Sequence, residues 1–158
     1  MTLRSLEYVK ITAVSEHPDF LIRTANWAYD QRNVRAIREQ VFITELGIPA
    51  ALEWDGRDAD ASHVIAETRQ GTAVGTARLL PDGQIGRMAV LPTYRGAGIG
   101  RRMLLRVLEL ARQRGFGEVF LHAQVTAIPF YRRCGFCTSG DVFQEAGIAH
   151  QTMRLTVQ

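Results

Sequence analysis

Apolar and polar positions follow two different spacings along this chain, and these predict its helices and strands. Over 98–114 the apolar residues recur every three or four positions, with arginine and glutamate opposite, which predicts an amphipathic helix. The segment 26–45 has the same spacing and predicts a second helix, which Gly47-Ile48-Pro49 would end. A shorter helix is expected around 127–133.

Short runs rich in Val, Ile, Leu and Phe predict the strands. We expect strands at 21–27, 63–68, 73–80, 85–91, 119–123, 137–145 and 150–157. Turn sequences such as Pro81-Asp82-Gly83 separate neighbouring runs. This order of elements predicts an α+β fold with a central mixed sheet flanked by helices. Residues 1–18 hold another apolar run, which predicts an extra N-terminal strand or a loose arm.

Composition indicates one soluble domain. The chain has 158 residues, 46% of them hydrophobic, and no linker, so we expect a single domain over 1–158. No apolar run approaches the ~20 residues of a membrane span, and the N-terminus lacks a signal-peptide pattern. We therefore expect a cytoplasmic protein that does not bind membranes. The net charge is +3, but no basic face with interleaved aromatic residues indicates nucleic-acid binding.

Cys134 and Cys137 have the Cys-x-x-Cys spacing of redox dithiols. A redox pair usually lies at a helix N-terminus, where the helix dipole lowers the thiol pKa. Here the pair follows the helical segment 127–133, and Gly135 suits the position after a helix end. We interpret the cysteines as packing residues. No further ligands at zinc-site spacing accompany them, so we expect no metal.

A glycine-rich segment joins the strand at 85–91 to the helix at 98–114. It reads Arg95-Gly96-Ala97-Gly98-Ile99-Gly100. Glycine lets a backbone approach a ligand closely, and the unpaired N–H groups of a helix start favour phosphate. Arg95 adds donors for phosphate oxygens, and further arginines crowd this region at 87, 101, 102 and 106. The segment predicts a site for a phosphorylated cofactor.

The glycine spacing excludes two common phosphate loops. A dinucleotide fingerprint needs a small residue where this chain has Arg101 or Met103, and a P-loop needs Lys-Ser/Thr where it has Arg101-Arg102. The remaining pattern, Arg-x-x-Gly-x-Gly, resembles the acyl-CoA pyrophosphate loop of the GNAT (GCN5-related) N-acetyltransferases. The alternative is an ordinary glycine-rich turn.

Three further segments strengthen this resemblance in the family's order and spacing. Residues 86–92 and 121–124 resemble the two central strands, and 129–136 resembles the family's Phe-Tyr-x-x-x-Gly-Phe segment. The resemblance covers 62–153 well and the first sixty residues loosely, and within the family the chain looks like a small uncharacterised bacterial branch. It implies a mixed sheet whose two central strands splay around acyl-CoA.

The resemblance also implies roles for individual residues. Backbone amides of Met88, Ala89 and Val90 would polarise the thioester carbonyl, and Gln124 would lie near the cofactor. Tyr131 matches the family's tyrosine that protonates the thiolate leaving group. The expected cofactor-binding residues are Met88, Ala89, Val90, Arg95, Gly96, Ala97, Gly98, Ile99, Gly100, Arg101 and Gln124.

The residue that deprotonates the amine stays open. Many family members carry a carboxylate on the first central strand, but 84–90 has none. The candidates are Glu45, Glu53, Asp55, His63, His122 and His150, of which we take Glu45 and Glu53 as catalytic residues beside Tyr131. The resemblance implies that the acidic and aromatic segment 49–61 forms a wall of the acceptor site, and the carboxylates within 53–60 would favour a cationic acceptor.

These observations predict an acetyl-CoA-dependent N-acetyltransferase. It would transfer the acetyl group of this cosubstrate to a primary amine of a small molecule or peptide by direct attack. The missing strand carboxylate motivates a second hypothesis, a non-catalytic acyl-CoA-binding sensor or interaction module. Many relatives pair through their last strands, so a homodimer is a further expectation.

Overall fold

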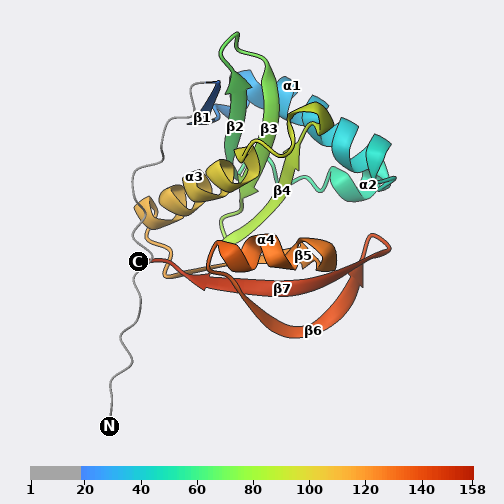
Figure 1. Cartoon of the computed structure of the whole chain (residues 1–158), viewed down its shortest axis with the longest axis vertical. Coiled ribbons are helices and arrows are strands. Elements are labelled where there is room, and N and C mark those ends of the chain that lie inside the picture. The colour runs from blue at the N-terminus through green and yellow to red at the C-terminus, as the bar shows by residue number, and fades with distance from the viewer. Residues whose placement is uncertain (1–18) are drawn as a thin grey trace.

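The sheet and its helices follow the predicted order of elements (Figure 1). The computed structural model describes residues 19–158. The strands are β1 (Phe20–Thr24), β2 (Ser62–Thr68), β3 (Ala73–Leu79), β4 (Gln84–Val90), β5 (Glu118–Gln124), β6 (Cys137–Glu145) and β7 (Ile148–Thr156). The helices are α1 (Trp27–Arg38), the π-helix η1 (Glu39–Glu45), α2 (Ala50–Glu53), α3 (Ile99–Gln113) and α4 (Ile128–Arg133), with short 3₁₀ turns η2 (Pro92–Tyr94) and η3 (Val125–Ala127). The strand or arm predicted at 1–18 lies outside the described residues.

The strands form one mixed sheet in the order β1-β2-β3-β4-β5-β7-β6. Neighbouring strands are antiparallel except β4 and β5, which are parallel. Helix α3 lies across one face of β1–β4 and α1 lies behind the opposite face (Figure 1). The predicted α+β fold with a flanked mixed sheet is therefore confirmed.

Asn26 sets the boundary between the first strand and the first helix. Its side-chain oxygen accepts a hydrogen bond from the Ala28 N–H at 3.1 Å, so it caps α1. The first strand ends at Thr24, earlier than predicted, because the chain must turn before this cap. The helix predicted over 26–45 continues past Arg38 as a π-helix, which the apolar spacing does not distinguish from an α-helix.

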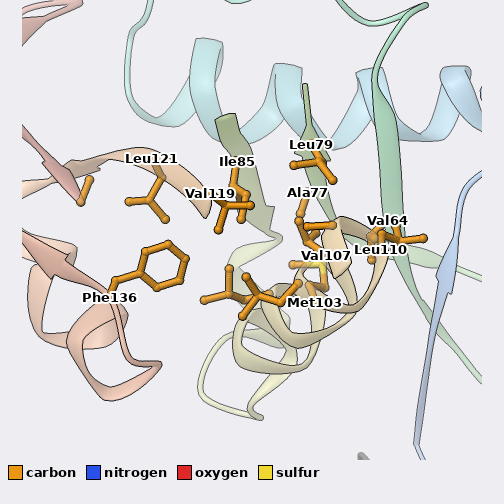
Figure 2. Close-up of a cluster of buried hydrophobic side chains, with 14 of the residues drawn as sticks. Val64, Ala77, Leu79, Ile85, Met103, Val107, Leu110, Val119, Leu121 and Phe136 are labelled. Carbon is orange, nitrogen blue, oxygen red and sulfur yellow. The ribbon is translucent and has the colours of Figure 1, made fainter. Parts of the chain in front are cut away.

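The main core lies between α3 and the sheet (Figure 2). The apolar face of α3 contributes Met103, Val107 and Leu110, which pack on Val64 of β2 and Ala77 of β3. The cluster extends to β5 and Phe136, and it fixes the start of α3 against β4 and α4. A smaller cluster of Ile37, Val41, Phe42 and Ala89 packs α1 and η1 on the other face.

Strand β4 bends away from β5 after two residues of pairing. Only Gln84 and Ile85 pair with β5, at Phe120 and Leu121. A bulge lies further along β4, where Arg87 and Met88 face a single β3 residue, between the pairs Arg78–Gly86 and Thr76–Ala89. The bulge includes Arg87 in a left-handed conformation, with φ 49°. The predicted splay of the two central strands is confirmed, and it opens the sheet beside Met88–Val90.

No helix within residues 19–158 is long and apolar enough to cross a membrane.

Candidate active site

The glycine segment forms an open backbone surface at the start of α3. Gly96 and Gly98 have φ values of 83° and 79°, a region that favours glycine. A Cβ at either position would meet no protein atom within 4 Å, so the space above both residues is free. Gly98 is the N-cap of α3 and offers no side-chain acceptor. The first N–H groups of this 15-residue helix therefore face the free space, as an anion site requires.

A cavity of about 610 Å³ lies over this segment, and we call it the loop cavity. Its walls come from β4, the segment 95–101, α3, α4 and η1. Of the residues predicted to bind the cofactor, all except Ala97 line it: Met88, Ala89, Val90, Arg95, Gly96, Gly98, Ile99, Gly100, Arg101 and Gln124. The size and the donors suit an elongated ligand that carries phosphate.

A second cavity, of about 440 Å³, is lined by His122 and His150, and we call it the histidine cavity. Phe42, Ile48 and Leu52 form an apolar wall opposite the C-terminal strands. The two cavities share the lining residues Phe42, Met88, Gln124, Ala127 and Tyr131. They therefore meet where β4 and β5 diverge, and a ligand in one could react with a ligand in the other.

Tyr131 lies at this junction with a neutral hydroxyl. Its hydroxyl is 3.7 Å from the Met88 sulfur, and its ring packs against Phe130 and Phe136. Burial, with a smaller contribution from Cys134, raises the pKa of Tyr131 to about 12. The phenol keeps its proton at neutral pH and can donate it to a group on either side. The structure thus brings Tyr131 together with the predicted cofactor residues.

Arg95 is held by Glu45 as well as by the backbone. Its guanidinium donates to both Glu45 oxygens at 2.7 and 2.8 Å, and its Nε donates to the Val90 carbonyl at 2.9 Å. The hydrogen bond from Arg95 lowers the pKa of Glu45. Glu45 lines the loop cavity rather than the histidine cavity. Its predicted role as a base stays a prediction, and the location and the lowered pKa weigh against it.

The acidic segment after α2 is held by buried arginines. Arg38 is 0% exposed and donates to Glu53 Oε1 at 2.7 Å and to Asp58 Oδ1 at 2.6 Å. Its guanidinium also lies 5.0 Å from the Trp54 ring. Glu53 does line the histidine cavity, but its other oxygen is 3.1 Å from Arg87 Nε. A base role for Glu53 remains a prediction that these two ion pairs disfavour.

Two more arginines complete this cluster. Arg78 donates to both Asp55 oxygens at 2.9 and 2.8 Å and to Asp58 at 3.0 Å, and Arg87 donates to Asp55 at 3.2 Å. Burial raises the pKa of Asp55, but the hydrogen bonds and charges of the neighbouring arginines outweigh it and hold that pKa well below its usual range. Three guanidiniums thus balance the carboxylates of Glu53, Asp55 and Asp58. The expected preference for a cationic acceptor stays a prediction, which this charge balance disfavours, and α2 does form a wall of the cavity.

The arginines that lie close to the glycine-rich segment in the sequence do not all lie close to it in the structure. Arg95 and Arg101 line the loop cavity, and Arg87 lines the histidine cavity. Arg102 and Arg106 instead reach β1, donating to the Phe20 carbonyl at 3.2 Å and the Thr24 hydroxyl at 3.3 Å. Helical spacing points these two away from the segment 95–100, so they are structural residues.

Of the three candidate histidines, two line a cavity and one does not. His63 is buried behind the sheet, where it stacks on Trp27 at 4.4 Å and its Nε2 contacts the Asp58 carbonyl at 2.9 Å. Burial lowers its pKa, and it lines neither cavity. His122 and His150 do line the histidine cavity, together with Glu145, which sequence reasoning missed. Glu145 is the last residue of β6, and only the return of β7 brings it to the two histidines.

Cys134 and Cys137 are both free thiols. Burial raises the pKa of Cys134, which is opposite to the activation of a redox thiol. Cys134 packs against the core, as interpreted, whereas Cys137 is exposed.

Comparison with known proteins identifies the family. The family description "Acetyltransferase (GNAT) domain" matches residues 28–157. The chain is 31% identical over 120 residues to the uncharacterized N-acetyltransferase YjcF of Bacillus subtilis, covering 74% of this chain and 86% of that protein. An acyl-CoA N-acyltransferase structure from Pseudomonas aeruginosa matches with a TM-score of 0.76 and 29% identity, covering 85% of this chain and 98% of that one. Escherichia coli ElaA matches with the same TM-score and 25% identity, covering 85% and 98%.

The fold, the glycine segment and these matches define an acyltransferase with two adjoining cavities. The chain belongs to the GNAT family and is an N-acetyltransferase. GNAT enzymes use an acyl-CoA cosubstrate and an amine acceptor. The alternative of a non-catalytic sensor finds no support in these comparisons.

Proposed function

We propose that the chain transfers an acetyl group from acetyl-CoA to a primary amine by direct attack, with the acyl-CoA in the loop cavity and the amine in the histidine cavity. One observation carries this proposal: the two cavities lie on either side of the β4–β5 divergence and share Tyr131. Direct attack requires donor and acceptor sites that adjoin at the reacting carbon.

The residues of the loop cavity fit an acyl-CoA. The N–H groups at the start of α3 and the side chain of Arg101 would hold the pyrophosphate. Arg95 is already paired with Glu45, so we assign it first to fixing the loop and second to the phosphates. Residues Met88–Val90 have no pairing partner on β5, which supports backbone amides of this segment as donors to the thioester carbonyl. Gln124 lines both cavities and would orient the acyl group.

Tyr131 is the proposed general acid. Its raised pKa keeps the proton on the phenol at neutral pH, so that Tyr131 can donate it to the sulfur as the carbon–sulfur bond breaks. The acceptor is an amine on a partly apolar body, because Phe42, Ile48 and Leu52 face the strand polar groups across the histidine cavity. The balanced charges of the acidic segment argue against selection of polycations.

Calorimetric titration of the purified protein with acetyl-CoA, desulfo-CoA and NADH tests the donor site. We expect micromolar binding of both CoA compounds and no binding of NADH. Gly98→Asp should abolish CoA binding, because it places a carboxylate where the pyrophosphate would lie. Gly115→Asp is a matched control: Gly115 has the same φ of 79° and equally open surroundings, but lies at the other end of α3. Equal effects of both substitutions would contradict the proposed site.

Turnover tests the acceptor site. Release of free thiol from acetyl-CoA is measured against a panel of aliphatic amines, amino sugars and peptide amines. We expect at least one primary amine to be acetylated. A protein that binds acetyl-CoA and acetylates none of them would contradict the proposal.

A further inference from the structure

Glu145, His122 and His150 form a cluster on one face of the C-terminal strands. His122 is on β5, His150 is on β7 opposite Gln124, and Glu145 ends β6. All three line the histidine cavity and none lines the loop cavity. The cluster therefore lies on the acceptor side of the Tyr131 junction.

The contacts of the cluster fix where the imidazole protons lie. His122 Nδ1 is 3.0 Å from Glu145 Oε1, and an ionised carboxylate can only accept a hydrogen bond, so Nδ1 carries the proton. His150 Nδ1 is 2.7 Å from the Ile148 carbonyl, which also only accepts. In the neutral rings, each Nε2 therefore holds a lone pair.

His122 is the more accessible of the two rings. Its side chain is 28% exposed, against 9% for His150. The Phe143 ring packs against both imidazoles. Its centroid lies 5.0 Å from that of His122 in an edge-to-face arrangement and 6.0 Å from that of His150 in a stacked one. The second Glu145 oxygen lies 3.8 Å from His150 Nε2, so Glu145 contacts His122 more closely than His150.

The other carboxylate candidates are engaged elsewhere. Glu53 shares this cavity but pairs with Arg38 and Arg87. Glu45 pairs with Arg95 in the loop cavity. Glu145 is itself 50% exposed and pairs with a histidine rather than an arginine. An arrangement of carboxylate, Nδ1–H and free Nε2 is one that orients an imidazole as a base.

We propose that His122 Nε2 is the general base that takes the proton from the acceptor amine, with Glu145 as the residue that orients it. This inference rests on the proposed function. The ammonium gives one proton to His122, which later releases it to solvent. As the nitrogen–carbon bond forms and the carbon–sulfur bond breaks, Tyr131 gives its proton to the sulfur and recovers the second proton lost by the nitrogen. The two protons lost by the ammonium are thus both accounted for.

Kinetics with an amine that the wild-type protein acetylates test this base. His122→Gln should lower kcat by about 10²- to 10⁴-fold and leave the calorimetric affinity for acetyl-CoA unchanged. Glu145→Gln should lower kcat less than His122→Gln does, because the imidazole stays in place but loses the carboxylate that orients its Nδ1–H. The other titratable groups around this cavity are Glu53, Arg87, Tyr131 and His150, and both variants keep them.

Glu118→Gln is the matched control for loss of a carboxylate. Glu118 begins β5, is exposed, pairs with Arg154 and lines neither cavity, so its loss should leave kcat unchanged. An unchanged kcat in His122→Gln, with wild-type turnover present, overturns the base and leaves the proposed function standing. A wild-type protein that acetylates no amine overturns both.

The protonation of the His122 ring can also be measured without an acceptor amine. Nitrogen-15 NMR of the imidazoles reports which nitrogen carries the proton. We expect His122 to be protonated on Nδ1 when neutral, and Glu145→Gln to weaken that preference. A His122 ring protonated on Nε2 would have no lone pair facing the amine and would overturn the assignment.

Discussion

The loop cavity and the histidine cavity adjoin, yet they are built by different parts of the chain. The loop cavity presents backbone N–H groups from the contiguous residues 95–101, and its ion pair between Arg95 and Glu45 is 42% and 37% exposed. The histidine cavity is lined by side chains from β4, β5, β6, β7 and α2. Its α2 wall is held by ion pairs whose arginine, Arg38, is fully buried. The ion pair beside the loop cavity is thus open to solvent, whereas the ion pairs that hold the α2 wall are buried.

Tyr131 is the strongest test of the junction between the cavities. Tyr131→Phe should lower kcat by about 10²- to 10⁴-fold, since it removes the proton for the leaving sulfur. The affinity for acetyl-CoA should stay within about twofold, because a single phenol hydroxyl contributes little to binding of so large a ligand. Steady-state kinetics and calorimetry on the same sample measure both quantities. A loss of affinity with kcat intact would place Tyr131 in binding and separate the two cavities functionally.

Substitution of Arg38 tests whether the buried ion pairs of the α2 wall stabilise the fold. Arg38→Met should reduce the free energy of unfolding by about 3–5 kcal/mol, because it removes the buried guanidinium that pairs with both Glu53 and Asp58 and leaves them only Arg87 and Arg78. Urea unfolding followed by circular dichroism measures this loss. The exposed pair of Arg57 and Asp82 supplies the comparison, and Arg57→Ala should cost less than about 1 kcal/mol. Similar losses of stability for the two variants would mean that the buried Arg38 ion pairs stabilise the fold no more than the exposed Arg57–Asp82 pair does.

Acid should destabilise the same wall. Burial raises the pKa of Asp58, but Arg38 and Arg78 outweigh it, so that the folded pKa lies below its unfolded value, as it does for Asp55. A carboxylate of this kind contributes stability above its unfolded pKa of about 4 and loses it as the pH falls through the folded pKa. We expect urea midpoints to fall steadily below pH 4, as these carboxylates lose their charge. Asp58→Asn should make this fall shallower; a fall of wild-type slope would exclude Asp58 as its source.

Glu45 provides the smallest expected effect and probes the donor side. Its carboxylate lies in the cavity assigned to an anionic ligand, so Glu45→Gln should tighten acetyl-CoA binding about two- to fivefold at low salt, as expected for an exposed charge. Titration at low and high salt should show the gain shrinking with ionic strength. Weaker binding by this variant would mean that Glu45 is needed to position Arg95. A large fall in kcat alone would restore Glu45 as a catalytic residue.

The loop cavity comes largely from contiguous residues and the histidine cavity from several strands, and this difference explains which parts of the site the sequence could predict. The strands, the long helices and the donor side follow from local patterns, since Met88 to Arg101 are neighbours in the chain. The charge balance of the acidic segment could not be predicted, because its partners Arg38, Arg78 and Arg87 come from three other elements. Glu145 carries no local signal, and only the pairing of β6 with β7 and of β7 with β5 brings it to His122. The π-helix was missed because apolar spacing does not resolve five-residue hydrogen bonds.

The assignment of donor and acceptor sides is tested most directly by backbone amide NMR during titration with acetyl-CoA. We predict that the largest shifts occur at residues 96–101 and 88–90, with smaller changes at Tyr131 and little change along β6 and β7. Shifts concentrated at His122, Glu145 and His150, with the amides of 96–101 unmoved, would place the acyl-CoA in the histidine cavity and contradict the account.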